Sequence, residues 1–151
     1  MAVGHSAHAQ ANMQFGLPTV ARLLAAGRTL VGVMALLAPR AVGRSFLGSL
    51  VDAPGGTAAV RTIGGRDLAL GAGALIADRR GRPLRGWIEA GVLVDLLDCF
   101  VAVFAGRGVP LLSRLGILVI GGGAAAAGVI AANGLREAGA SNGGSYLADG
   151  D

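Results

Sequence analysis

The sequence predicts an all-α fold, a four-helix transmembrane bundle with disordered polar termini, from its composition and its hydrophobic patterning. Of 151 residues, 53% are hydrophobic and 15% are charged, whereas a soluble domain carries about 25% charged residues. Four apolar blocks rich in Leu, Ala, Val and Gly each approach the roughly 20 residues needed to cross a bilayer, and none shows the alternation typical of strands. A disordered chain and, with one cysteine, a disulfide-stapled module are excluded. A soluble helical bundle remains the alternative.

The first block covers residues 18–38. Pro18 suits the first turn of a helix, where its missing N–H costs nothing, and Pro39 closes the block. The preceding residues 1–16 are small and polar, without the basic opening of a secretory signal, and predict a flexible N-terminal tail. The transmembrane domain is therefore expected over residues 17–133.

The second block covers residues 58–77 and follows a Pro-Gly-Gly break in the chain. Thr57 is expected to cap this helix, because a threonine hydroxyl can accept a hydrogen bond from a free N–H of the first turn. In the connection before the break, residues 44–51 predict a short amphipathic segment that lies in the membrane interface.

The third and fourth blocks cover residues 87–105 and 115–133. The fourth alone is free of charge, and it alone is expected to meet the plain hydropathy criterion for a spanning helix. The Gly- and Ser-rich residues 134–151 predict a disordered tail. The loop at residues 79–85 holds four arginines, so the positive-inside rule places it, and with four spans both termini, on the cytoplasmic side of the cytoplasmic membrane.

Charged residues near the centres of three blocks are the most informative feature: Arg28, Arg66, Asp67, Asp95 and Asp98. A lone charge at the bilayer centre costs about 2.5–3.5 kcal/mol, and arginine cannot lose its proton. Both arginines therefore need acceptors, and Asp95 and Asp98, three residues apart on one helix face, can supply them. Asp67 is expected to face a neighbour other than Arg66. Since carboxylates outnumber arginines, we expect one aspartate to be protonated or to lie beside water.

Two interpretations of this midplane cluster stay open. In the first, the charges form a buried ion-pair network that fixes which helix packs on which. In the second, they form a proton relay, an ion path or a site for a polar headgroup, which is the usual reason for ionisable groups inside a membrane.

Small residues recur every four positions in two blocks and predict faces where helices approach closely. The predicted packing residues are Ala69, Gly73 and Ala77 in the second block and Ala124, Gly128 and Ala132 in the fourth.

Nothing in the sequence indicates an enzyme, a cofactor or a metal site. Zinc-ligand spacings, catalytic triads and a nucleophile elbow are missing from the pattern, and His5 and His8 alone are too few to hold a metal. The net charge of +4 comes with arginine as its only basic residue type. These arginines are scattered among apolar segments, so the lipid bilayer rather than nucleic acid is the expected partner.

The Gly-x-Arg-Asp motif at residues 64–67, the basic loop and the Asp-x-x-Asp motif at residues 95–98 together resemble a known pattern. The chain resembles a family of small uncharacterised four-helix integral membrane proteins of high-GC, actinobacterial-type bacteria. The resemblance covers about residues 18–132. It implies the four-helix architecture and points to Gly64 besides the charged residues, and it implies no activity.

We therefore hypothesise a multi-pass accessory or scaffold-type membrane protein held by its midplane Arg/Asp cluster. It would self-associate through its small-residue faces or join a larger membrane complex. The alternative is a small transport or proton-handling module that uses Asp95 and Asp98, and a membrane enzyme is the weakest hypothesis.

Overall fold

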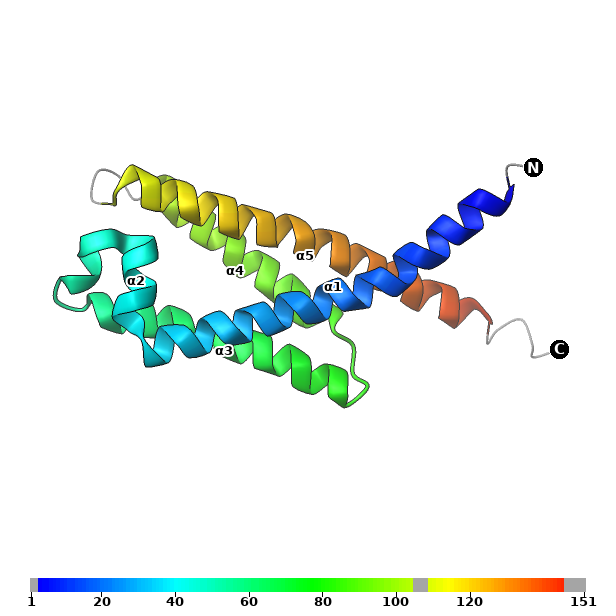
Figure 1. The fold of residues 1–151 in the computed structure, drawn as a ribbon. Coiled ribbons are helices and arrows are strands. Elements are labelled where there is room, and N and C mark those ends of the chain that lie inside the picture. Colours follow the sequence, from blue (N-terminus) through cyan, green and yellow to red (C-terminus); the bar gives the residue numbers. More distant parts are fainter. Residues whose placement is uncertain (1–2, 105–108, 146–151) are drawn as a thin grey trace.

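The computed structural model describes the backbone of residues 3–104 and 109–145, and side-chain surroundings for residues 16, 18–104 and 109–137. No strand occurs within these ranges, which confirms the all-α class for the described part of the chain. The elements are α1 (Val3–Leu37), α2 (Pro39–Leu47), the 3-10 helix η1 (Gly48–Asp52), α3 (Gly56–Arg79), α4 (Arg85–Phe104) and α5 (Leu111–Ser145) (Figure 1).

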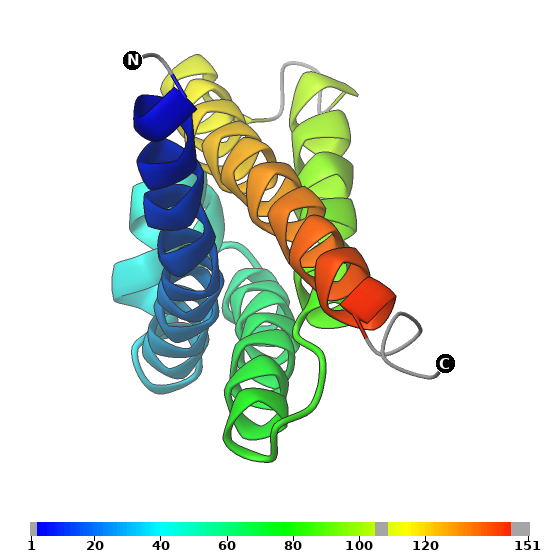
Figure 2. The same ribbon diagram turned by 90° about the vertical axis from the view of Figure 1, so that its right-hand side faces the viewer.

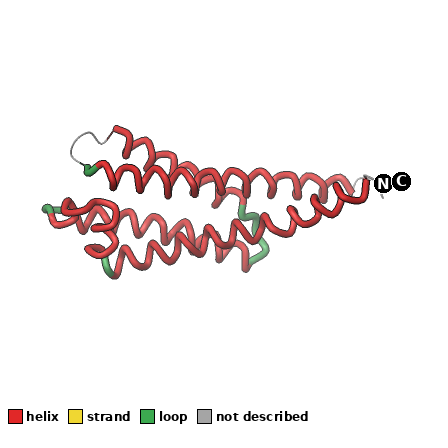
Figure 3. The backbone as a smooth tube through the Cα atoms, turned by 45° about the horizontal axis from the view of Figure 1, so that its top comes forward, coloured by secondary structure: helices red, strands yellow, loops and turns green. Residues whose placement is uncertain are grey.

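The four long helices form two pairs. α1 runs along α3 and α4 runs along α5, whereas α3 and α4 touch at few points although they are consecutive in the chain (Figure 2). The tube drawing separates the two pairs as two layers (Figure 3). The start of α1, the end of α5 and the α3–α4 loop lie towards one end of the bundle, and α2 lies at the other.

The α1–α3 pair is packed through small residues separated by three, four or seven positions. The buried positions on α1 are Ala21, Ala25, Gly32 and Ala35, and those on α3 are Val60, Gly64, Gly71, Ala74 and Ala77. A Cβ placed on Gly64 would lie 2.6 Å from Ala35 Cβ, closer than real Cβ atoms come. The backbones can approach this closely only because these side chains are small.

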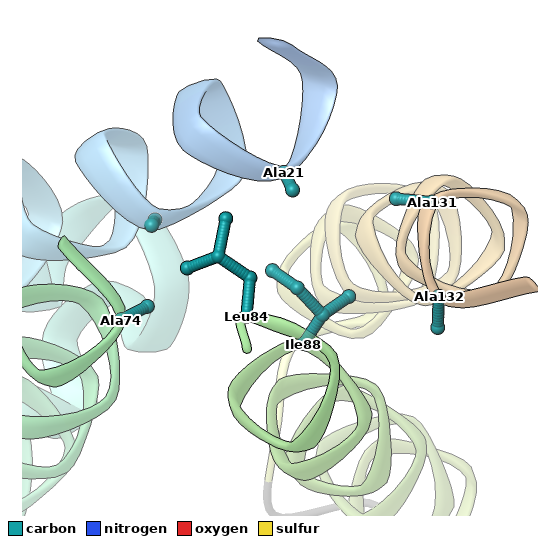
Figure 4. Packing of buried hydrophobic residues seen from close by; sticks show 7 residues of the cluster. Ala21, Ala74, Leu84, Ile88, Ala131 and Ala132 are labelled. Carbon is teal, nitrogen blue, oxygen red and sulfur yellow. The ribbon is translucent and has the colours of Figure 1, made fainter. Parts of the chain in front are cut away.

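Two apolar clusters hold the ends of the bundle. In the first, Leu84 and Ile88 project between α1, α3 and α5 towards Ala21, Ala74 and Ala131 (Figure 4). In the second, α2 and η1 fold back on α1 and α3.

That second cluster is built around Val51, with Ala35 and Val60 beside it. Gly43 of α2 faces Val51 and Val60 without room for a side chain.

The distribution of side-chain size is the reverse of that in a soluble protein. Among the described residues the largest fully buried side chain is Val51, and alanine dominates the interior. Large apolar side chains point outward: Leu112 is 82% exposed, Leu37 78% and Phe104 70%. A soluble monomer rarely exposes so much contiguous apolar surface, so this outer surface fits contact with hydrocarbon.

Two described segments are long and apolar enough to cross a membrane. They are Pro18–Leu37, with a mean hydropathy of 1.7, and Leu111–Glu137, with a mean hydropathy of 2.1, and only 22% of an apolar 18-residue stretch in each is buried. A core helix of a soluble protein would be mostly buried. The prediction that residues 115–133 alone meet the hydropathy criterion is wrong, because α1 meets it despite its arginines.

The structure also corrects both predicted tails. Residues 3–16 belong to α1 and residues 134–145 to α5, so these parts are helical rather than flexible or disordered. The N-terminal part contains good helix formers and no proline. In the C-terminal part, Leu135 packs against the first apolar cluster. Residues 1–2 and 146–151 of the predicted tails lie outside the described residues.

Helix boundaries differ from the prediction at three residues. Pro18 lies inside α1 rather than in its first turn. Pro39 ends the first block as expected but also opens α2. The N-cap of α3 is Gly55, in a left-handed conformation with φ +83° and without a side-chain cap, rather than Thr57; the glycine allows a turn that threonine would resist.

The predicted packing stripes are corrected on α3. Ala77 is buried, Gly73 lies under the Trp87 ring, and Ala69 is exposed. On α5, Gly128 and Ala132 are buried and Ala124 is half-buried. Gly128 contacts Val92 of α4.

Candidate functional site

The five midplane charges meet in the structure as one continuous chain of ion pairs, here named the charge chain. Its order is Asp95–Arg28–Asp67–Arg66–Asp98. One member comes from α1, two from α3 and two from α4. The chain therefore connects α4 with the α1–α3 pair, in the region between the two apolar clusters.

Arg28 is the centre of the buried half. Its Nη1 donates to Asp67 Oδ1 at 3.2 Å, and its Nη2 donates to Asp95 Oδ2 and, at 2.9 Å, to the carbonyl of Gly91. A Cβ on Gly91 would lie 3.1 Å from Arg28 Nε. The glycine thus leaves room for the guanidinium to lie against the backbone of α4.

Arg66 holds the outer half. Its Nη1 and Nη2 donate to the two carboxylate oxygens of Asp98 at 3.0 and 2.8 Å, the forked geometry that gives Arg–carboxylate pairs both strength and direction. Nη2 also lies 3.4 Å from Asp67 Oδ1. Asp67 was expected to face a neighbour other than Arg66; it contacts Arg28 and Arg66 together, since the long guanidinium folds back towards the adjacent residue.

The solvent exposure of the side chains is lower at the Asp95 end of the charge chain than at the Asp98 end. The side chains of Arg28, Asp67 and Asp95 are 11–18% exposed, whereas those of Arg66 and Asp98 are 32% and 37% exposed. The open end lies between α3 and α4, which touch at few points although they are consecutive in the chain. Arg66 Nε is buried and has no hydrogen-bond partner among the described residues.

A small cavity of about 20 Å³ lies at the buried end, lined by Arg28, Asp95 and Gly91 among mostly apolar residues. This volume holds about one water molecule, and the charged groups offer it partners.

The arrangement is chemically suited to holding helices together. Each arginine of the charge chain binds two carboxylates. Within the described residues no group of three or more His, Cys, Asp or Glu side chains could hold a metal. Cys99 lies next to Asp98 and its sulfur faces Gly121 of α5, which is the position of a small packing residue.

Sequence reasoning missed several polar contacts between the helices. Arg22 of α1 pairs with Asp78 of α3 at 2.8 Å, and Arg114 of α5 donates to the carbonyls of Ala102 and Val103 at the end of α4. The Gly91 carbonyl carries no sequence signal. The Arg22–Asp78 pair could have been found, because Arg22 lies near the start of the predicted first block and Asp78 directly follows the second, so an antiparallel arrangement brings them to the same end.

Comparisons with protein-family models, curated proteins and solved structures gave no match. The resemblance to small four-helix membrane proteins therefore stays a prediction. Function is inferred from the geometry of the charge chain and from the outward-facing apolar surface.

Proposed function

We propose that this chain is a multi-pass membrane protein, a transmembrane bundle of α1, α3, α4 and α5, that acts as an accessory or scaffold protein. The observation that carries the proposal is the charge chain, whose members are all paired and which joins the two helix pairs in the middle of an apolar structure.

The pairing supports membrane crossing by the two charged helices. α3 and α4 contain too many charges to resemble plain spanning helices, but their central charges face one another inside the bundle. α4 has 20 residues, about 30 Å of helix, which matches the hydrocarbon thickness. Its outer face carries Leu93, Leu97 and Phe100, each more than half exposed.

The same pairing supports a structural role. Lipid is as apolar as leucine, so helices in a bilayer associate through close packing and polar contacts. α1 and α3 pack closely, but α3 and α4 touch little, and the charge chain adds ion pairs from α4 to both α1 and α3. Buried ion pairs specify an arrangement more than they add net stability, which suits a scaffold that presents a fixed surface to partner proteins or to further copies.

The basic α3–α4 loop favours the cytoplasmic side of the cytoplasmic membrane for its end of the bundle. The start of α1 and the end of α5 lie towards that same end (Figure 1), which agrees with an even number of crossings.

A charge-neutralisation cycle tests the structural role. Arg28→Gln leaves Asp95 buried without its arginine and should destabilise the bundle by about 3–5 kcal/mol. Arg28→Gln combined with Asp95→Asn removes the pair, leaves Asp67 bound to Arg66, and should recover most of that loss. The measurement is the free energy of unfolding in mixed detergent micelles.

Arg85 and Glu89 provide the matched control, since this exposed pair lies within α4 alone. Arg85→Gln and Glu89→Gln should each change stability by less than about 1 kcal/mol. A double variant at Arg28 and Asp95 no more stable than Arg28→Gln would contradict a role for the charge chain in joining the helices.

One observation favours the second candidate, a proton-handling module: Asp95 lines the cavity with room for a water molecule. Proton flux into vesicles that contain the purified protein and a pH-sensitive dye distinguishes the scaffold proposal from the proton-handling candidate. The scaffold proposal expects proton flux equal to that of empty vesicles, whereas proton handling requires a flux above this background that Asp95→Asn abolishes.

A further inference from the structure

A hollow of about 630 Å³ lies beside the α3–α4 loop, and we name it the loop hollow. Its wall comes from the last turns of α3, the loop itself and the first turn of α4, including Gly73, Ile76, Arg80, Arg82 and Trp87. The volume falls in the range of pockets that hold small organic ligands.

Glycines shape the apolar part of the loop hollow. A Cβ on Gly73 would overlap the ring of Trp87, so the six-membered ring of the indole contacts the backbone of α3. A Cβ on Gly86 would meet nothing within 4 Å, so this side of α4 is open. Ile76 is about half exposed beside the ring, and together these residues form an apolar floor.

Uncompensated positive charge lies at the rim. Arg80 and Arg82 are exposed, and no acidic partner for either occurs among the described residues. The nearby acids are occupied, because Asp78 binds Arg22 and Glu89 binds Arg85.

The loop is also held in shape. The N–H groups of Arg80 and Arg82 donate to the carbonyl of Ala77 at 3.1 and 2.9 Å, and Gly81 between them has φ +64°. Arg80 and Arg82 therefore belong to a hydrogen-bonded turn that fixes the position of their backbone, rather than to an irregular loop.

We propose that the loop hollow binds one anionic phospholipid, with its phosphate on Arg80 and Arg82 and an acyl chain against Trp87 and Ile76. The arginines at the rim would contact the headgroup of a phospholipid, and the apolar floor would contact its acyl chain. Basic pockets between transmembrane helices at the cytoplasmic membrane surface recognise anionic headgroups. The inference rests on the proposed function in one respect, namely that α3 and α4 cross the membrane.

The experiment uses Trp87, the single tryptophan of the chain, as its probe. The full-length protein is reconstituted in vesicles of a neutral host lipid. Either acyl-brominated phosphatidylglycerol or acyl-brominated phosphatidylcholine is added at the same mole fractions, and quenching of Trp87 fluorescence is measured as this fraction increases. Each arginine at the membrane surface is worth about five-fold in affinity for an anionic lipid, so two predict a preference of about 30-fold for phosphatidylglycerol.

Variants assign the preference to the loop hollow. Arg80→Gln with Arg82→Gln should reduce the preference to near parity, while quenching by the neutral lipid stays unchanged. Arg80→Lys with Arg82→Lys should retain most of it. Arg40→Gln, which removes an exposed charge from α2 at the other end of the bundle, should leave it intact.

The outcomes separate this inference from the proposed function. Equal quenching by both lipids in the unmodified protein, or a preference that survives in the double glutamine variant, would overturn the lipid site while membrane crossing stands. Release of quenching by added inorganic phosphate would also overturn it, in favour of a site for free phosphate. Absence of quenching by either lipid would contradict membrane crossing itself.

Discussion

A single methyl group should distinguish the tightly packed face of α3 from the position next to it. Gly64 lies in the α1–α3 contact, and Gly65 beside it has open space: a Cβ on Gly64 would lie 2.6 Å from Ala35 Cβ and 3.0 Å from the Gly32 carbonyl oxygen, whereas a Cβ on Gly65 would meet nothing within 4 Å. The perturbation is therefore Gly64→Ala, with Gly65→Ala as its matched control.

The expected difference in unfolding free energy between the two variants can be estimated from the contact that only Gly64→Ala creates. Carbon atoms in contact settle about 3.5–4.0 Å apart, so Gly64→Ala must push α1 and α3 apart by roughly an ångström, and Ala35 has no side-chain torsion that could relieve the contact. Overpacking of this kind costs about 1–3 kcal/mol. The gain in helix propensity from Gly to Ala, up to about 1 kcal/mol, is common to both variants. Their difference in stability therefore isolates the overpacking, at about 1–3 kcal/mol.

The assay is reversible unfolding in mixed micelles of a mild detergent and dodecyl sulfate, followed by far-ultraviolet circular dichroism. Gly65→Ala should unfold at or above the dodecyl sulfate fraction of the unmodified protein, and Gly64→Ala at or below it. Equal midpoints for the two variants would refute close packing of α1 on α3 through Gly64.

Three further predictions concern the outer surface, the tryptophan and the end of α4. Leu30 is 64% exposed near the middle of the apolar part of α1; Leu30→Asp should destabilise the protein in bilayers by about 2.5–3.5 kcal/mol, whereas a change within about 0.5 kcal/mol, as on a water-exposed surface, would contradict lipid contact. Gly73→Ala should displace the Trp87 ring and shift its emission maximum, with Gly65→Ala leaving the spectrum unchanged. Arg114→Ala removes the donor to two carbonyls of α4 and should lower amide-exchange protection at the end of that helix by about 1.5–3 kcal/mol; unaltered protection there would show that the contact is not needed.

The sequence was sufficient to identify the members of the charge chain but not their pairing. Depth can be counted from the ends of an apolar block, so residues near the centres of antiparallel helices can be expected to meet. Pairing depends on the rotation of each helix about its axis and on the neighbour it faces. The structure pairs Arg28 with Asp95 and Arg66 with Asp98, a choice that counting along one helix cannot make.

On α3 the predicted packing stripe is corrected at Ala69, whereas Gly73 contacts Trp87 and Ala77 is buried. A stripe with a period of four residues advances 400° per step and so drifts about 40° around the helix each time. Ala69, at the start of the predicted stripe, is accordingly exposed. A spacing of alternately three and four residues drifts only about 20° per seven residues, and this is the spacing of Gly64, Asp67, Gly71 and Ala74.

The same spacing explains the positions of Arg28 and Asp67, the two members of the charge chain that lie on the α1–α3 face. Arg28 falls between Ala25 and Gly32 in the α1 series, and Asp67 falls between Gly64 and Gly71 in the α3 series. Each charged residue thus occupies a position of the close-packed face that a small residue would otherwise fill. The Arg28 side chain binds Asp67 of α3 and extends towards α4, where Gly91 leaves it space and Asp95 binds it. Close packing within one helix pair and ion pairing to the other are therefore parts of one arrangement: a larger residue at Gly91 should weaken the attachment of α4 while leaving the α1–α3 contact in place.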